Sequence, residues 1–139
     1  GHMISVIYGK KGTGKTKKIL DMANEAVKVS TGELVFIDDD NSYMYDLRHE
    51  IRFVNATEYD VADPETFMGF VCGILAGNYD MKQLFIDGFL RIVKTDMAEL
   101  EAFFAKLEDI AHRHGVDVVI SASAKDDEVP EFLKKYIQE

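Results

Sequence analysis

The sequence predicts an α/β fold in which a mostly parallel sheet lies between two layers of helices. Short apolar runs of strand length alternate along the chain with longer segments whose apolar residues repeat at helical spacing. Most of these runs are continuously apolar, as is typical of strands buried on both faces of a parallel sheet. Right-handed crossovers between such strands would give a three-layer α-β-α sandwich. At 139 residues, the chain is expected to form a single domain.

The first strand is expected at residues 3–8, and a helix at about residues 15–30 after a glycine-rich loop. The helix would turn one face to the sheet, because its apolar residues are three or four positions apart. These residues are Ile19, Leu20, Ala23, Ala26 and Val27. Thr31-Gly32 would end the helix.

The middle of the chain supplies three more strands and a helix. Residues 34–37 and 84–87 are expected to form buried strands, and residues 51–55 a strand that could lie at an edge of the sheet. A helix is expected after Asp63, because an acidic N-cap is followed by Pro64 at the first helical position. Its buried residues would be Phe67, Phe70, Val71, Ile74 and Leu75.

The last part of the chain predicts a long helix, a strand and a final helix. The long helix is expected at about residues 95–114, with Asp96 and Glu99 three positions apart as in a capping box. Its apolar face comprises Met97, Leu100, Phe103, Phe104, Leu107, Ile110 and Ala111. A strand is expected at residues 116–121, and a helix after Pro130. That helix would bury Phe132, Leu133, Tyr136 and Ile137.

The loop after the first strand, Gly9-x-x-x-x-Gly14-Lys15-Thr16, matches the phosphate-binding Walker A motif at every fixed position. Glycines allow the backbone to turn successive N–H groups toward one phosphate, and the following helix adds the positive end of its dipole. Lys15 would reach the β- and γ-phosphates, and the Thr16 hydroxyl would bind Mg²⁺. The predicted nucleotide-binding residues are Gly9, Gly12, Thr13, Gly14, Lys15 and Thr16.

Charge is unevenly distributed along the chain. The formal net charge is −9, which argues against a broad surface for nucleic acid or anionic membranes. No acidic residue precedes Asp21, whereas five lysines do, at positions 10, 11, 15, 17 and 18. The positive cluster therefore lies where a polyphosphate would bind.

Several classes of protein are disfavoured by what the sequence lacks. No apolar run approaches the roughly 20 residues of a membrane span and no secretory signal is recognisable, so a cytoplasmic protein is expected. Gly1-His2-Met3 looks like a cloning scar with the natural start at Met3, and residues 3–139 would be the nucleotide-binding domain. The single cysteine, Cys72, argues against an internal disulfide or a zinc site built from cysteines.

Polar residues end several of the predicted strands. Ligands of parallel sheets bind at the carboxyl ends of the strands, so these residues are expected beside the phosphate-binding loop. They are Asp38, Asn55, Asp87 and Ser121. Asp87 follows an apolar strand and is the candidate Walker B aspartate, which holds Mg²⁺. A turn-forming Asp87-Gly88 pair is the alternative interpretation.

With these two motifs, the chain resembles the P-loop NTPase superfamily. A strand and further secondary structure separate the loop from Asp87, so the chain is similar to the RecA-like or additional-strand branch and looks like a small, single-domain bacterial ATP-binding protein. The resemblance implies that the Asp87 strand is not next to the strand of the loop. It also implies that Ser121 senses the γ-phosphate, the alternative being a plain strand-end serine.

The chain also departs from the pattern of that branch. Members that hydrolyse ATP usually carry a glutamate after the Walker B aspartate, but Gly88 stands at this position. Another carboxylate would have to be the base, and Asp38, Asp39 and Asp40 are candidates, although they equally suit a solvated acidic turn. Arg91 is a candidate arginine finger, with a surface salt bridge as the alternative. No guanine-selecting, transporter-ATPase or arginine-rich lid motif is recognisable.

The sequence supports three functional hypotheses. The first is Mg²⁺-dependent ATP binding with slow hydrolysis, or with hydrolysis activated by a protein partner or a second copy that completes the site. Its candidate catalytic residues are Lys15, Asp87, Asp38 and Ser121, and its candidate metal ligands are Thr16 and Asp87. The second is phosphoryl transfer to a small metabolite or a nucleotide, with Asp38 or Asp39 as base. The third is a nucleotide sensor or scaffold without catalysis.

Overall fold

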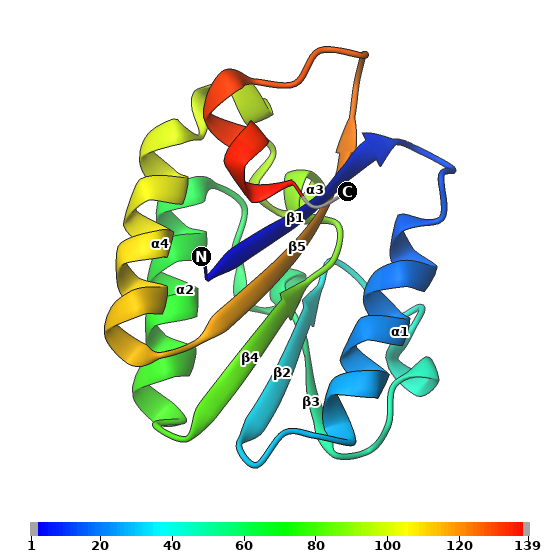
Figure 1. Cartoon of the computed structure of the whole chain (residues 1–139), viewed down its shortest axis with the longest axis vertical. Coiled ribbons are helices and arrows are strands. Elements are labelled where there is room, and N and C mark those ends of the chain that lie inside the picture. Colours follow the sequence, from blue (N-terminus) through cyan, green and yellow to red (C-terminus); the bar gives the residue numbers. More distant parts are fainter. Residues whose placement is uncertain (1–2, 138–139) are drawn as a thin grey trace.

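The computed structural model describes residues 3–137 and shows within them one five-stranded sheet whose strands are all parallel (Figure 1). In order across the sheet, the strands are β1 (Ile4–Lys10), β5 (Asp117–Ala124), β4 (Met81–Ile86), β2 (Glu33–Asp38) and β3 (Ile51–Asn55). Helices lie on both faces, which confirms the predicted three-layer sandwich. Gly1 and His2, which belong to the predicted cloning scar, lie outside the described residues.

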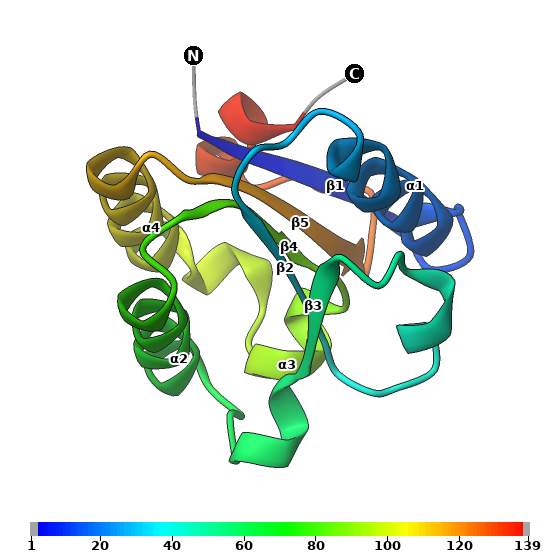
Figure 2. The same cartoon turned by 90° about the horizontal axis from the view of Figure 1, so that it is seen from below.

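Helix α1 covers one face of the sheet, and α2 and α4 cover the other (Figure 2). The α-helices are α1 (Lys15–Val27), α2 (Pro64–Gly77), α3 (Phe89–Val93) and α4 (Glu101–His114). Short 3₁₀ helices are η1 (Met44–Asp46), η2 (Ala56–Tyr59), η3 (Met97–Glu99) and η4 (Glu131–Tyr136). None of the helices within residues 3–137 is both long enough and apolar enough to span a membrane.

The inner strands are apolar along their length because both of their faces are buried. Along β2, Phe36 packs on the α1 side, where its ring stacks between Phe53 and Phe85 with ring centroids 6.3 Å apart in each pair. Val35 and Ile37 face the opposite layer. Burying a side chain of this size contributes about 1.5–3 kcal/mol relative to leaving it in water. This two-sided burial is the physical basis of the continuous apolar runs.

Asp63 is the N-cap of α2, as predicted, and forms a capping box with Thr66. Asp63 accepts a hydrogen bond from the N–H of Thr66 at 2.8 Å, and the Thr66 hydroxyl accepts one from the N–H of Asp63 at 3.3 Å, so α2 begins where the sequence predicts. The prediction of a capping box from Asp96 and Glu99 is wrong. The Asp96 carboxylate instead accepts a hydrogen bond from the Lys125 ammonium at 3.1 Å, which ties it to the loop after β5.

The segment between β4 and α4 differs most from the prediction. In place of the single helix expected at about residues 95–114, the chain forms η3 and the shorter α4, and the unpredicted helix α3 precedes them. Phe89, Ile92 and Val93 of α3 are buried, and Lys94 ends the helix in a left-handed conformation with a φ of 51°. Helix α3 is only five residues long, too short for helical periodicity to be recognised in a sequence.

The last predicted helix is a 3₁₀ helix, η4, rather than an α-helix. Of the four residues predicted to be buried, Leu133 and Tyr136 are buried, whereas Phe132 and Ile137 are only partly buried. Beyond η4, Ile137 forms a parallel bridge with Val6 of β1. The end of the described chain therefore packs against the side of β1 that has no neighbouring strand.

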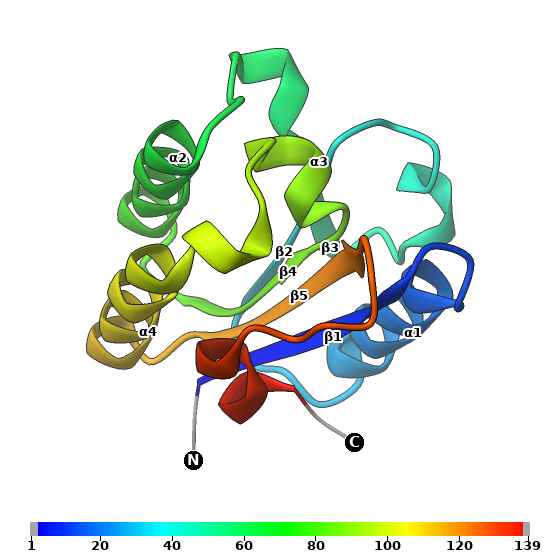
Figure 3. The ribbon, with the colours of Figure 1, turned by 90° about the horizontal axis from the view of Figure 1, so that it is seen from above.

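Strand β4 is not next to β1, because β5 lies between them. Since only one strand separates them, the loop after β1 lies close to the end of β4. Strand β3 lies at the opposite edge of the sheet from β1. Because all five strands are parallel, their carboxyl ends share one edge, which Figure 3 shows from above. The loops that follow β1, β2, β4 and β5 meet at this edge.

Candidate functional site

Glycines shape the loop between β1 and α1. Gly12 and Gly14 have φ angles of 87° and 83°, in the left-handed region that favours glycine. A Cβ atom at Gly9 would lie only 3.2 Å from the Thr13 hydroxyl. Gly14 is the N-cap of α1 and offers no side chain to the amides of the first turn. These N–H groups are therefore available to an anion.

The Lys15 ammonium folds back over the loop. It donates hydrogen bonds to the Lys10 carbonyl at 2.7 Å and to the Thr13 hydroxyl at 3.3 Å, and that hydroxyl also donates to the Lys10 carbonyl at 2.7 Å. Burial lowers the pKa of Lys15 from its ordinary value, the charge of Asp87 opposes this shift, and the charge of Arg91 adds to it. The ammonium thus lies within electrostatic reach of both groups.

Three predicted site residues from distant parts of the chain meet at one carboxylate. The Thr16 hydroxyl donates to Oδ2 of Asp87 at 3.2 Å, and the Ser121 hydroxyl donates to Oδ1 of the same carboxylate. Asp87 is 1% exposed, and its N–H donates to the Ile37 carbonyl at 2.9 Å. A hydroxyl and a carboxylate side by side at the start of α1 offer the oxygen ligands that Mg²⁺ prefers.

A cavity of ≈ 470 Å³ opens in front of these groups. Of the predicted site residues, those that line it are Gly12, Gly14, Lys15, Thr16, Asp40, Asp87 and Ser121. The others lie outside its lining: Gly9, Thr13, Asp38, Asp39 and Asn55. Lys11, Lys17 and Arg91 add positive charge to its wall. Both the glycine-rich backbone and the excess of cationic groups suit a polyphosphate.

Asp38 is a buried carboxyl group at the end of β2. Its side chain is almost fully enclosed, and Oδ2 has no hydrogen-bond partner within residues 3–137, whereas Oδ1 accepts from the Asp39 N–H at 2.7 Å. Burial, followed by the nearby Asp39 carboxylate and the charge of Asp87, raises the pKa of Asp38 to about 8. Carboxylate oxygens of Asp38, Asp39 and Asp40 lie within 4.8 Å of one another. The raised pKa favours the protonated form of Asp38.

The structure also shows a pairing that the sequence did not predict. Arg91 Nε donates to Asp39 Oδ2 at 2.8 Å, and Arg91 Nη2 donates to Asp39 Oδ1 at 3.2 Å. Gly88 lies directly beneath this ion pair with a φ of 65°, and a Cβ there would lie 2.5 Å from Arg91 Nη2 and 2.8 Å from Asp39 Oδ1. The position after Asp87 thus has no room for a glutamate side chain in this arrangement.

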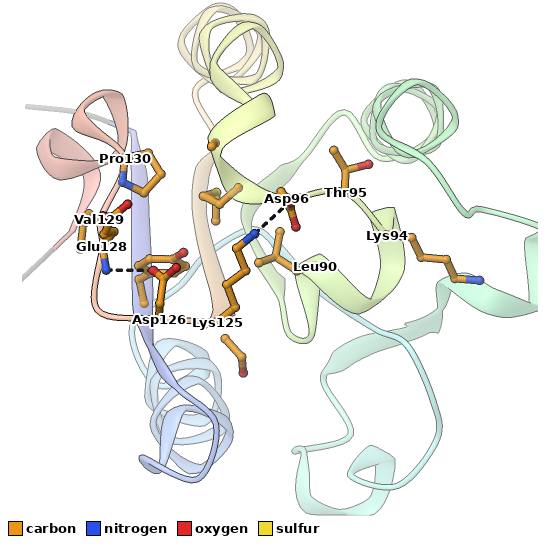
Figure 4. A pocket seen from close by; sticks show the side chains of 13 residues that line it. Leu90, Lys94, Thr95, Asp96, Lys125, Asp126, Glu128, Val129 and Pro130 are labelled. Atoms are coloured by element: carbon orange, nitrogen blue, oxygen red, sulfur yellow. Dashed lines mark hydrogen bonds and ion pairs between the residues drawn. The ribbon is translucent and has the colours of Figure 1, made fainter.

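A second cavity, of ≈ 580 Å³, lies at the same edge of the sheet (Figure 4). Its apolar lining comprises Tyr8, Leu90, Met97, Ala98, Val129 and Pro130. The ion pair between Lys125 and Asp96 lies across it, as the dashed line in Figure 4 shows. Ser123 lines both cavities, which are therefore neighbours. No sequence motif marks this cavity, because its walls come from three separate segments of the chain.

Fold and site together define an α/β protein with a glycine-rich loop before α1 and a buried carboxylate, Asp87, that accepts a hydrogen bond from Thr16. No family model matches the chain, and no curated protein matches it. What the site does is therefore inferred from its own geometry.

Proposed function

We propose that the chain is a phosphate-loop nucleotide-binding protein of the RecA-like kind, and more particularly that it binds Mg-ATP. The observation that carries the proposal is the hydrogen bond between Thr16 and Asp87, which brings the Walker A hydroxyl to the candidate Walker B carboxylate at 3.2 Å. A chance match to either motif would not bring the two together. A cytoplasmic location stays a prediction of the sequence.

In this proposal, the loop and the start of α1 bind the phosphates. The amides around Gly12 and Gly14 and the Lys15 ammonium would hold the β- and γ-phosphates. Thr16 and Asp87 would hold Mg²⁺, whose charge offsets that of the phosphate oxygens. Ser121 fixes the Asp87 carboxylate through its hydrogen bond and so orients this ligand before the nucleotide arrives.

Slow or partner-activated hydrolysis suits the carboxylates of the site. In hydrolysis, a water oxygen attacks the γ-phosphorus, the bond to the β–γ bridging oxygen breaks, and the water gives up a proton. Asp38, the candidate base, lies outside the cavity lining, and its raised pKa favours the protonated form. It would have to lose its proton and gain access to the cavity, which a partner or a second copy of the chain could bring about.

Phosphoryl transfer to a small molecule is the second candidate, because a cavity suited to an acceptor adjoins the phosphate cavity at Ser123. Its apolar lining and charged rim would suit a small amphipathic molecule. A phosphorylated acceptor would distinguish this reaction from hydrolysis, which releases free phosphate. A third candidate, a sensor without catalysis, would keep bound ATP intact for hours in the presence of Mg²⁺.

Isothermal titration of the full chain with ATP, with and without Mg²⁺, tests the proposal. We expect saturable binding that is tighter with Mg²⁺ than without it. Thr16→Ala and Asp87→Asn should reduce this effect of Mg²⁺, whereas the control Thr57→Ala, at the same edge of the sheet, should leave it unchanged. Absence of heat and of a thermal shift at millimolar Mg-ATP would end the proposal.

A further inference from the structure

Arg91 lies at the boundary between the phosphate cavity and the carboxylates that follow β2. It follows β4 on α3, lines the cavity together with Lys15 and Thr16, and binds Asp39 through two hydrogen bonds. Its side chain is 54% exposed, whereas that of Asp39 is 16% exposed. The guanidinium is therefore accessible from the cavity, while its carboxylate partner is held in the protein.

The contact between Arg91 and Asp39 has the geometry of a guanidinium bound to an oxyanion. Two N–H groups meet two carboxylate oxygens, at 2.8 Å and 3.2 Å. A phosphate presents oxygens with the same charge and a similar spacing, and arginine binds both groups in this bidentate manner. Asp39 thus occupies the donors that a phosphate at this wall of the cavity would use.

We propose that Arg91 distinguishes a nucleoside triphosphate from a diphosphate, and that Asp39 competes with the terminal phosphate for its guanidinium. This inference rests on the proposed function, since it requires a nucleotide in the cavity. The charge of Arg91 already reaches the Lys15 ammonium, whose pKa it helps to lower. The two cations therefore act on the same region of the cavity, where the end of a triphosphate would lie.

The ion pair between Arg91 and Asp39 determines how strongly the triphosphate is preferred over the diphosphate. When the terminal phosphate binds Arg91, it replaces Asp39. Only the difference in free energy between these two contacts therefore favours the triphosphate. Gly88 makes the arrangement sterically feasible, since any side chain there would meet both partners. Removing the Asp39 charge should release Arg91 for the nucleotide and increase the preference.

Isothermal titration with Mg-ADP and with the Mg²⁺ complex of the β,γ-imido analogue of ATP measures this preference as a ratio of dissociation constants. We expect Asp39→Asn to tighten binding of the analogue by on the order of tenfold while ADP is unchanged. Arg91→Ala should lower the ratio, leaving only the preference that Lys15 and the loop amides supply. In the Arg91→Ala background, Asp39→Asn should have no further effect, as a double-mutant cycle requires of a competing pair.

The matched control is Asp109→Asn, which breaks a similar ion pair with Arg113 on α4, remote from the cavity. It should change neither affinity. If Arg91→Ala fails to fold, Arg91→Lys takes its place, because lysine keeps the charge but lacks the planar fork, and the ratio should again fall.

Three outcomes would overturn the inference while leaving nucleotide binding intact. Asp39→Asn could change both affinities equally, it could change neither, or its effect could persist without Arg91. A wild-type chain that binds neither nucleotide would instead overturn the proposed function, and the inference with it.

Discussion

The Thr16 hydroxyl donates a hydrogen bond to the Asp87 carboxylate, although 71 positions separate the two residues in the sequence. The contact joins the start of α1 to the end of β4, and Ser121 at the end of β5 donates to the same carboxylate. Three elements are thus fixed against one another at the mouth of the cavity. A ligand that binds there would contact groups from all three.

Replacing Lys15 with alanine should weaken ATP binding at least tenfold, because each charge-assisted hydrogen bond to a phosphate contributes about 1.5–3 kcal/mol. Isothermal titration with Mg-ATP provides the measurement. The control is Lys134→Ala, which removes a lysine that pairs with Glu131 on η4. An unchanged affinity of Lys15→Ala would show that this loop does not bind the phosphates.

Ser121→Ala should destabilise the protein by roughly 1–3 kcal/mol, since the buried Asp87 carboxylate then loses a hydrogen-bond donor. Urea unfolding followed by circular dichroism gives the free energy of unfolding. The control is Ser123→Ala, two residues along β5, which removes a hydroxyl from a position that is less buried than Ser121. Equal effects of the two changes would argue against a special role for the Ser121 contact.

Gly88→Ala should lower the free energy of unfolding by at least about 1–2 kcal/mol, because a left-handed backbone disfavours any Cβ atom. The new methyl group would also displace the pair between Asp39 and Arg91. Gly69→Ala provides the comparison, because a Cβ there meets nothing within 4 Å and alanine favours the interior of α2 by about 0.5–1 kcal/mol. Thermal melts should therefore shift in opposite directions.

Asp38 should make stability depend on pH. Its pKa is raised to about 8 in the folded protein, mainly by burial, against about 3.9 in an unfolded chain. The folded state binds the proton more tightly, so this stabilisation is complete below about pH 4 and is lost as the pH rises from about 4 to about 8. Wild-type stability should fall over this range relative to Asp38→Asn, by at most about 1.4 kcal/mol per pH unit.

Urea unfolding at several pH values measures this difference between wild type and Asp38→Asn. Asp40→Asn, which alters an exposed acid of the same turn, is the control and should follow the wild-type curve. Parallel curves for wild type and Asp38→Asn would show that Asp38 does not hold its proton in the folded state.

The site residues that could be predicted from the sequence are those that belong to a short, recognisable sequence pattern. The Walker A spacing identified Lys15 and Thr16, and an acid after a buried strand identified Asp87. The sequence also named Asp39 and Arg91, but not as partners, because nothing in a chain records that residues 52 positions apart share an ion pair. For the same reason, the neighbouring cavity at Ser123 was not foreseen.

By itself, the sequence determined the fold class, the glycine-rich loop and the start of α2, because each depends on the order of residues within a short segment. Only the tertiary structure decided that Gly88 lies against the ion pair of Asp39 and Arg91, that burial raises the pKa of Asp38, and that Asp96 binds Lys125 instead of capping a helix. Each of these properties depends on burial and on partners from other strands, and the packing of the sheet and its loops alone determines both.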